Sequence, residues 1–244
     1  MNNQAELQEL AVELGREERG LALFGEGNVS ARANDNTFWV SASHSFLSNT
    51  QKNDLVECRF DKVLSLLERT SLEEAQVILG LADARVHEIE KNPSSESLFH
   101  AYLLTLPGVI FVAHIHPISV NQILCSARAK EFADNRMFPE EIIQCGASSL
   151  FVPYKDPGLP LAQSLRRLCE GYIQKYGVPR VILLENHGAI ALGTTAHSVL
   201  NTTLLLEKAA HIWLGAASLG GPKYLHVDHI RRIQEKVHRQ TSML

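Results

Sequence analysis

Two histidines separated by one residue, His114 and His116, constrain this chain more than any other feature of its sequence. They end a run rich in valine and isoleucine, residues 109–116, which favours a β-strand. Side chains two positions apart on a strand point from the same face, so the two imidazoles can bind the same divalent metal. The chain has 11 histidines, however, and such a pair also arises by chance among histidines that only satisfy a hydrogen bond. The spacing alone leaves both interpretations open.

A third histidine strengthens the metal interpretation. His187 lies in Asn186-His187-Gly188, directly after a second apolar run at 181–184. Three imidazoles with one open coordination position are typical of a catalytic zinc site, whereas structural zinc sites are closed by four protein ligands. We therefore treat His114, His116 and His187 as candidate ligands of one metal.

Length and composition limit the class of protein. A chain of 244 residues with 45% apolar and 20% charged residues fits one large α/β domain, residues 1–244. The net charge of −4 argues against a nucleic-acid partner, which requires clustered positive charge. The four cysteines include no C-x-x-C pair and signal neither a zinc ribbon nor a thioredoxin-type site. Without a signal peptide or a membrane-spanning run, we expect a cytoplasmic protein with no membrane partner.

The spacing of apolar residues predicts alternating helices and strands. Helices are predicted at 5–24, 72–86, 96–106, 117–126, 161–176 and 196–219. Strands are predicted at 37–41, 109–116, 150–153, 181–184 and 189–192. The last two strands are expected to pair as a hairpin around the Asn-His-Gly turn. Hairpins mixed with crossover helices indicate an α/β layered fold with a partly antiparallel sheet.

Glu96 has two possible roles. It follows Ser94 and Ser95 at the start of a predicted helix, where a carboxylate stabilises the N-terminus through the helix dipole. Alternatively it acts as a general base beside a metal that acidifies the substrate. The sequence around this residue does not decide between the two.

A glycine-rich turn, Gly-Glu-Gly-Asn-Val-Ser at 25–30, also has two interpretations. It either stops a helix, or its backbone N–H groups and the Asn28 side chain hold an anion. Three serines could add neutral donors to such a site: Ser43, Ser94 and Ser95.

Six segments together resemble the class II aldolase/adducin family. In chain order they are G-N-V-S-A-R (27–32), S-A-S-H (41–44), P-S-S-E (93–96) with His100, H-I-H-P (114–117), V-P-Y (152–154) and N-H-G (186–188). They follow the order of the family and span about residues 5–220, and a helical tail is predicted for 221–244. Each segment is weak alone, whereas the combination is highly specific.

The resemblance implies a fold and an assembly. It implies a single three-layer α/β/α domain with a largely antiparallel, mixed central sheet, assembled as a homotetramer with active sites at subunit interfaces. It also implies one divalent metal, usually Zn²⁺, held by the residues that match His114, His116 and His187.

The resemblance also implies a reaction. Members split a small sugar phosphate into dihydroxyacetone phosphate and an aldehyde. The residue matching Glu96 is the acid/base in the aldolases, and an aspartate occupies this position in the related 4-epimerases. Glutamate here favours a metal-dependent lyase that performs retro-aldol cleavage of a sugar phosphate or related hydroxy-carbonyl compound through a zinc-stabilised enediolate.

Two departures from the family pattern bear on the substrate. The phosphate loop, commonly T-P-S-G, reads Ser41-Ala42-Ser43-His44, so a histidine replaces a glycine that lets the backbone approach the phosphate. Either the imidazole binds the anion itself or the substrate lacks that phosphate. In addition, no tyrosine lies between His116 and Tyr154, where the aldolases' proton donor should fall.

We therefore predict a substrate or phosphate pocket that adjoins the metal. Its predicted members are Asn28, Ser43, His44, Ser94 and Ser95. The alternatives on the same scaffold are a non-catalytic, adducin-like binding or assembly module, a sugar-phosphate 4-epimerase, a dehydratase and a decarboxylase.

Overall fold

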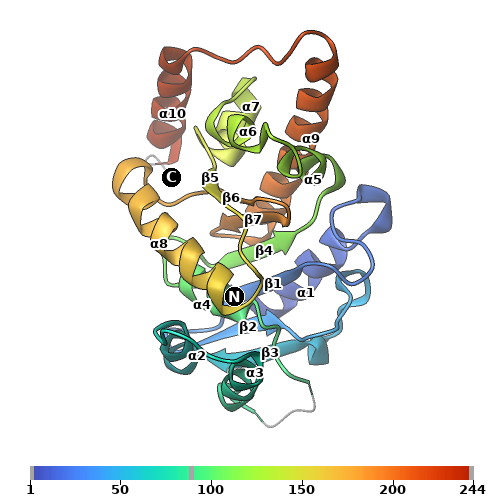
Figure 1. Cartoon of the computed structure of the whole chain (residues 1–244), viewed down its shortest axis with the longest axis vertical. Helices are drawn as coiled ribbons and strands as arrows, with labels where there is room; N and C mark the ends of the chain where they lie inside the picture. Colours follow the sequence, from blue (N-terminus) through green and yellow to red (C-terminus); the bar gives the residue numbers. More distant parts are fainter. Residues whose placement is uncertain (1–2, 88–90, 242–244) are drawn as a thin grey trace.

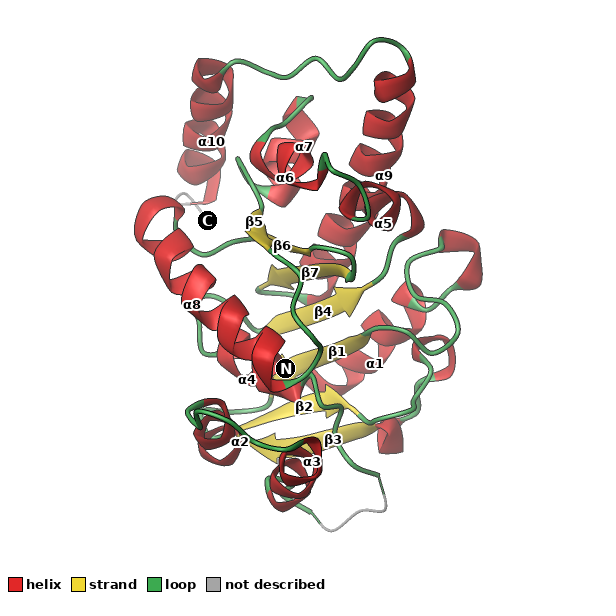
Figure 2. Ribbon diagram, viewed as in Figure 1, coloured by secondary structure: helices red, strands yellow, loops and turns green. Residues whose placement is uncertain are grey.

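A seven-stranded sheet forms the centre of the molecule. The computed structural model describes residues 3–87 and 91–241. Along the sheet the strands follow the order β3-β2-β1-β4-β7-β6-β5, and only β5 and β6 pair in parallel (Figure 2). The strands are β1 (Asn28–Arg32), β2 (Thr37–Ser41), β3 (Leu55–Arg59), β4 (Phe111–Ile115), β5 (Leu150–Val152), β6 (Val181–Leu184) and β7 (Gly188–Gly193). This confirms the predicted mixed, largely antiparallel sheet and the hairpin around His187.

Helices cover both faces of the sheet. Those of the described residues are α1 (Asn3–Leu14), α2 (Phe60–Leu67), α3 (Glu74–Asp83), α4 (Ser97–Leu104), α5 (Ile118–Leu124), α6 (Ala129–Asp134), α7 (Pro139–Cys145), α8 (Leu159–Tyr176), α9 (Ala196–Ser218) and α10 (Val227–Thr241). One hydrophobic core lies between the sheet and α2, α3, α4 and α8, and a second lies between the sheet and α1, α5, α6 and α9 (Figure 1). The predicted three layers are therefore present. No helix in 3–87 or 91–241 is both long and apolar enough to cross a membrane.

Strand β4 lies at the middle of the sheet and sets the direction of the histidines. All five of its residues are buried, including the polar His114. Phe111, Ala113 and Ile115 enter the core beside α1, α5 and α9. Alternation along the strand sends His114 to the opposite face, where its ring lies edge-on to Phe99 of α4 at 5.7 Å between centroids. The histidine pair therefore faces the start of α4.

Several elements differ from the sequence-based expectation. The first helix ends at Leu14 rather than extending to residue 24. A Cβ at Gly15 would lie 2.1 Å from the backbone nitrogen of Ser48, so the chain passes too close to the 47–49 turn to carry any larger residue. The strands and α-helices not predicted from the sequence are β1, β3, α2, α6 and α7. Each has no more than eight residues, too few for a clear periodic signal.

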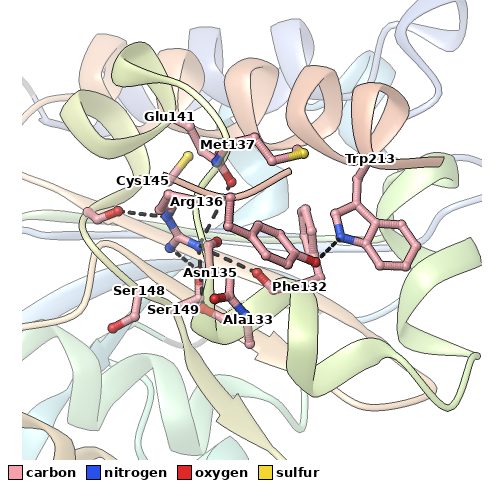
Figure 3. A network of polar contacts seen from close by, with 12 residues as sticks. Phe132, Ala133, Asn135, Arg136, Met137, Glu141, Cys145, Ser148, Ser149 and Trp213 are labelled. Carbon is pink, nitrogen blue, oxygen red and sulfur yellow. Dashed lines mark hydrogen bonds and ion pairs between the residues drawn. The ribbon is translucent and has the colours of Figure 1, made fainter. Parts of the chain in front are cut away.

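A buried arginine ties together the short elements that precede β5. Arg136 is only 2% exposed, and Figure 3 shows its guanidinium surrounded by backbone carbonyls. It donates hydrogen bonds to Gly146 O (2.7 Å), Asn135 O (2.8 Å) and Ser149 Oγ (2.8 Å). The Glu141 carboxylate, also buried, lies 3.9 Å away. Burial of this charge is tolerated because its donors are hydrogen-bonded and an opposite charge lies close by.

Candidate active site

The structure brings together the three predicted metal ligands. His114 lies within β4, His116 follows the end of β4, and His187 occupies the turn from β6 to β7. Because β4 and β7 pair with Ile115 opposite Ala189, the turn carries its imidazole to the end of β4. Ligand atoms of the three histidines all lie within 4.8 Å of one another, and the Nε2 atoms of His114 and His116 are 2.9 Å apart.

The protonation state of these histidines suits a metal. The Nδ1–H of His114 donates to the carbonyl of Ala189 at 3.1 Å, which leaves the lone pair on Nε2, the atom that faces His116. Burial lowers the pKa of both His114 and His116 to about 3, so both rings are neutral at pH 7. Neutral imidazole is the metal-binding form, and an all-nitrogen donor set suits Zn²⁺ among the common divalent ions. The residues therefore fit the metal that the resemblance implies.

Glu96 lies against the same cluster. It occupies the N-cap position of α4, yet its side chain makes no capping hydrogen bond. Its Oε2 lies 3.5 Å from His114 Nε2, and its Oε1 lies 3.6 Å from His187 Nε2. Of the two interpretations of Glu96, the geometry therefore favours a carboxylate of the site over a helix cap.

A network from β1 and α4 holds this carboxylate in place. Asn28 pairs with His114 in the sheet register, and its Nδ2 donates to Glu96 Oε2 at 2.6 Å. The other end of the amide, Oδ1, is hydrogen-bonded to His100 Nε2, and His100 Nδ1 is hydrogen-bonded to Ser30 Oγ at 2.6 Å. Burial lowers the pKa of His100 to about 3, so this ring is neutral and its Nε2–H donates to Asn28 while Nδ1 accepts from Ser30. Asn28 thus presents its amide N–H group to Glu96.

No role for His100 or Ser30 was predicted from the sequence. A signal existed for His100, because Glu96 and His100 are four residues apart and share one face of a helix. No comparable signal existed for Ser30, whose contact depends on the pairing of β1 within the sheet.

A pocket of about 240 Å³ opens beside the histidines. It is lined by all five predicted substrate-binding residues, Asn28, Ser43, His44, Ser94 and Ser95, and also by Gly25, Gly27, Ala42, Ser45, Glu96, His116, Pro157 and His187. Among these described lining residues there is no lysine or arginine. An anion in this pocket would be held by neutral donors and by His44. Not every hydroxyl is free for this purpose, since Ser43 already donates to Pro93 O at 3.0 Å.

His44 keeps the backbone shape of the glycine that it replaces. Its φ is +60°, in the left-handed region that non-glycine residues rarely adopt. The S-A-S-H segment thus turns as a glycine-containing loop would, and the substitution adds an imidazole to the pocket wall. Strain of this kind, retained beside a candidate site, points to a functional constraint.

Comparisons with known proteins show which family the chain resembles. A relative from Haemophilus influenzae, "3-oxo-tetronate 4-phosphate decarboxylase", is 25% identical over 94% of this chain and 96% of its own length. The crystal structure of YgbL from Escherichia coli, "a putative aldolase/epimerase/decarboxylase", superposes with a TM-score of 0.71 at 21% identity, over 94% of this chain and 96% of that one. An L-fuculose 1-phosphate aldolase superposes with a TM-score of 0.72 at 19% identity, over 96% of this chain and 95% of that one.

The two structural likenesses show a shared fold. The family described as "Class II Aldolase and Adducin N-terminal domain" matches residues 6–214, most of the chain. That range includes the three histidines, Glu96 and the serine-lined pocket. The chain belongs to the class II aldolase and adducin family.

Proposed function

We propose that this protein is a metal-dependent lyase that decarboxylates a small 3-oxo acid phosphate. One observation carries the proposal: Glu96 is the only carboxylate among the described residues that line the pocket, and it lies within 3.6 Å of two histidine nitrogens. The relationship to a 3-oxo-tetronate 4-phosphate decarboxylase across almost the whole chain supports the same substrate class.

In this proposal, one set of residues binds the metal and another set binds the phosphate of the substrate. His114, His116 and His187 would hold the divalent ion, Zn²⁺ in our prediction. When bound, the ion would supply a Lewis acid that draws electron density from the 3-oxo group of the substrate. Ser94, Ser95, His44 and the second N–H of the Asn28 amide would hold the phosphate of the substrate in the same pocket.

The proposed reaction needs a single proton delivery. The bond between the carboxyl carbon and carbon 2 breaks, CO₂ leaves, and the bonding electron pair stays on the substrate. A proton then adds to carbon 2, and a four-carbon substrate becomes a three-carbon hydroxyketone phosphate. Glu96 would take up a proton from water and deliver it to carbon 2, and the Asn28 amide would keep its carboxyl group at the histidine cluster.

Retro-aldol cleavage, the reaction expected from the resemblance, makes larger demands on the site. It requires a base that removes a hydroxyl proton and an acid that protonates the carbon fragment. The described lining residues include neither a second carboxylate nor a tyrosine. We therefore rank decarboxylation first and keep retro-aldol cleavage as the alternative for the same site.

Product analysis separates the two reactions. The full chain would be freed of metal with a chelator, reloaded with Zn²⁺, and incubated separately with 3-oxo-tetronate 4-phosphate and L-fuculose 1-phosphate. We expect metal-dependent CO₂ release from the first compound and no aldehyde from the second. His187→Ala, prepared in the same way, should release little CO₂.

If the protein released aldehyde but no CO₂, decarboxylation would be wrong and retro-aldol cleavage would become the proposed activity. If the zinc-loaded protein released neither product, the non-catalytic, adducin-like interpretation would be favoured.

A further inference from the structure

We propose that Glu26 is a positioning residue for His116: its carboxylate accepts the Nδ1–H of this histidine and orients Nε2 toward the metal position. The inference rests on the proposed metal site, and it assigns a role to a residue outside the predicted site. Glu26 lies in the glycine-rich turn, and its Oε2 is 3.9 Å from His116 Nδ1.

The sheet register explains why these two residues meet. Asn28 of β1 lies opposite His114 of β4 in an antiparallel pair. Glu26 lies two residues before the start of β1, and His116 lies one residue after the end of β4. The two residues therefore lie just beyond the Asn28–His114 pair, at the same end of the two strands, where their side chains approach to 3.9 Å.

The backbone around Glu26 holds it close to β4. A Cβ at Gly27 would lie 2.7 Å from the carbonyl oxygen of His114, which shows how near the two chains run. The N–H of Glu26 donates to Leu23 O at 2.8 Å, and the N–H of His116 donates to Leu21 O at 2.9 Å. Both partners are therefore anchored to the same loop by main-chain hydrogen bonds.

The two nitrogens of His116 have different surroundings. Its Nε2 lies 2.9 Å from His114 Nε2, within the histidine cluster, whereas Nδ1 faces the Glu26 carboxylate. A histidine that binds a metal through one nitrogen donates its other N–H to a carboxylate, a carbonyl or water, which fixes the tautomer and the ring orientation. Ala189 O serves His114 in this way. Among the described residues, Glu26 has the only carboxylate within 4.0 Å of His116 Nδ1.

The distance between the Glu26 carboxylate and His116 Nδ1 can change, because the Glu26 side chain is partly exposed. The side chain of His116 is 19% exposed and that of Glu26 is 43% exposed. A small rotation of the half-exposed carboxylate, or one bridging water, completes a hydrogen bond across the present 3.9 Å. The contribution of Glu26 therefore appears when the metal is bound and is absent from the stability of the metal-free protein.

The test measures zinc affinity by competition with a chromophoric chelator, using the full-length metal-free protein. Glu26→Ala should weaken Zn²⁺ binding by about 10- to 100-fold, the usual effect of removing such a partner. Glu26→Gln, which keeps an acceptor but not the charge, should lie between this variant and the original protein. Glu18→Ala is the matched control, since Glu18 is also an exposed carboxylate at ion-pair distance, 3.8 Å from Arg16. Its zinc affinity should stay unchanged.

The absorption spectrum of the Co²⁺-loaded protein gives a second readout that is independent of turnover. It should change in Glu26→Ala and stay the same in Glu18→Ala, while the metal-free unfolding midpoints of all variants agree. If Glu26→Ala and Glu18→Ala bind Zn²⁺ alike while the original protein binds it tightly, the role of Glu26 is wrong and the metal site stands. If the original protein binds no Zn²⁺, the proposed function itself is overturned.

Discussion

The geometry around Glu96 distinguishes between the two roles that the sequence leaves open, a helix cap and a carboxylate of the candidate site. A glutamate at a helix start interacts favourably with the helix dipole wherever its side chain points. Here the side chain makes no capping bond and is instead held by Asn28 at 2.6 Å, beside His114 and His187. The carboxylate is therefore held within the site, and its role in proton transfer stays a prediction.

Replacing Glu96 by glutamine tests this role. Glu96→Gln keeps the size of the side chain and removes its capacity to transfer a proton. We expect CO₂ release from the zinc-loaded protein to fall by about 100-fold or more, the usual contribution of a positioned acid/base group. Folding and zinc content should persist. Glu74→Gln, the same change in the first turn of α3, should leave the rate unchanged. Equal rates in Glu96→Gln and the original protein would remove the proton-transfer role.

The His44 imidazole gives a second prediction at this scale. Glycine at residue 44 relieves a left-handed backbone that costs roughly 1 kcal/mol, and the added freedom of the unfolded chain offsets about as much. The free energy of unfolding should therefore change little. Affinity for inorganic phosphate, measured by calorimetry on the zinc-loaded protein, should fall about tenfold, because a hydrogen bond to a charged group is lost.

Phe24 supplies the control for the backbone effect. It is also left-handed, with a φ of +50°, and is 92% exposed outside the pocket lining. Phe24→Gly should relieve similar strain and leave phosphate affinity unchanged. Tighter phosphate binding by His44→Gly would mean that the imidazole only obstructs the site.

At this scale the sequence could identify residues whose spacing is local. The His114–His116 pair and the Asn-His-Gly turn are visible in short windows, and all three rings meet in the structure. Glu26 and Ser30 were not identifiable, since their contacts, with His116 and His100, join residues at least 70 positions apart in the chain. Pairing between distant segments leaves no local pattern to read.

At the scale of elements, the approach of β7 to β4 determines where His187 lies. A Cβ at Gly188, the first residue of β7, would lie 2.6 Å from Ile115 O and 2.7 Å from His116 Cδ2. Gly188→Ala should lower the free energy of unfolding by about 1–3 kcal/mol through overpacking, and it should also weaken zinc binding. Urea unfolding and chelator competition measure the two effects.

Gly171 of α8 offers a matched replacement in open space. A Cβ there meets no atom within 4 Å, and alanine is favoured over glycine in a helix by about 1 kcal/mol. Gly171→Ala should raise the free energy of unfolding and leave zinc affinity unchanged. If Gly188→Ala changed the free energy of unfolding and the zinc affinity in the same way as Gly171→Ala, the close approach of β7 to β4 would not determine the geometry of the metal site.

Elements with a long periodic pattern or a continuous apolar run were predictable, and several short elements without such a pattern were not. The long helix predicted at 196–219 corresponds closely to α9, Ala196–Ser218, and the strand predicted at 181–184 is β6. By contrast β1, Asn-Val-Ser-Ala-Arg, contains a single β-branched residue and is a strand because β2 and β4 pair with its two edges. Its tertiary surroundings override a weak intrinsic preference.

At the scale of the whole molecule, buried neutral histidines couple folding to pH. The folded-state pKa values of His100, His114 and His116 are lowered to about 3 by burial, whereas the unfolded chain protonates histidine near pH 6.5. The free energy of unfolding is therefore highest above about pH 6.5, and it decreases as the pH falls from there toward 3, because the unfolded chain takes up protons that the buried rings do not. For the metal-free protein, the free energy of unfolding in urea should therefore drop by at least about 1 kcal/mol between pH 6.5 and 5.5. Equal or greater stability at pH 5.5 would contradict the burial of these rings as neutral groups.

The assembly expected from the family stays a prediction. A homotetramer with active sites between subunits follows from the resemblance alone, and the cytoplasmic location rests only on the sequence pattern. Sedimentation equilibrium of the purified protein should give a mass of about four chains. The mass of a single chain would place the complete site within one subunit.

The central claim is that three histidines, from β4 and the β6–β7 turn, hold one divalent metal, and zinc content tests it most directly. Protein purified without chelator, then exposed to Zn²⁺ and desalted, should carry about one Zn²⁺ per chain. His187→Ala and His114→Ala should lose this ion, whereas His211→Ala, at an exposed position on α9, should retain it. If the His187 and His114 variants retained as much zinc as the His211 variant, the metal centre and the lyase built on it would be contradicted.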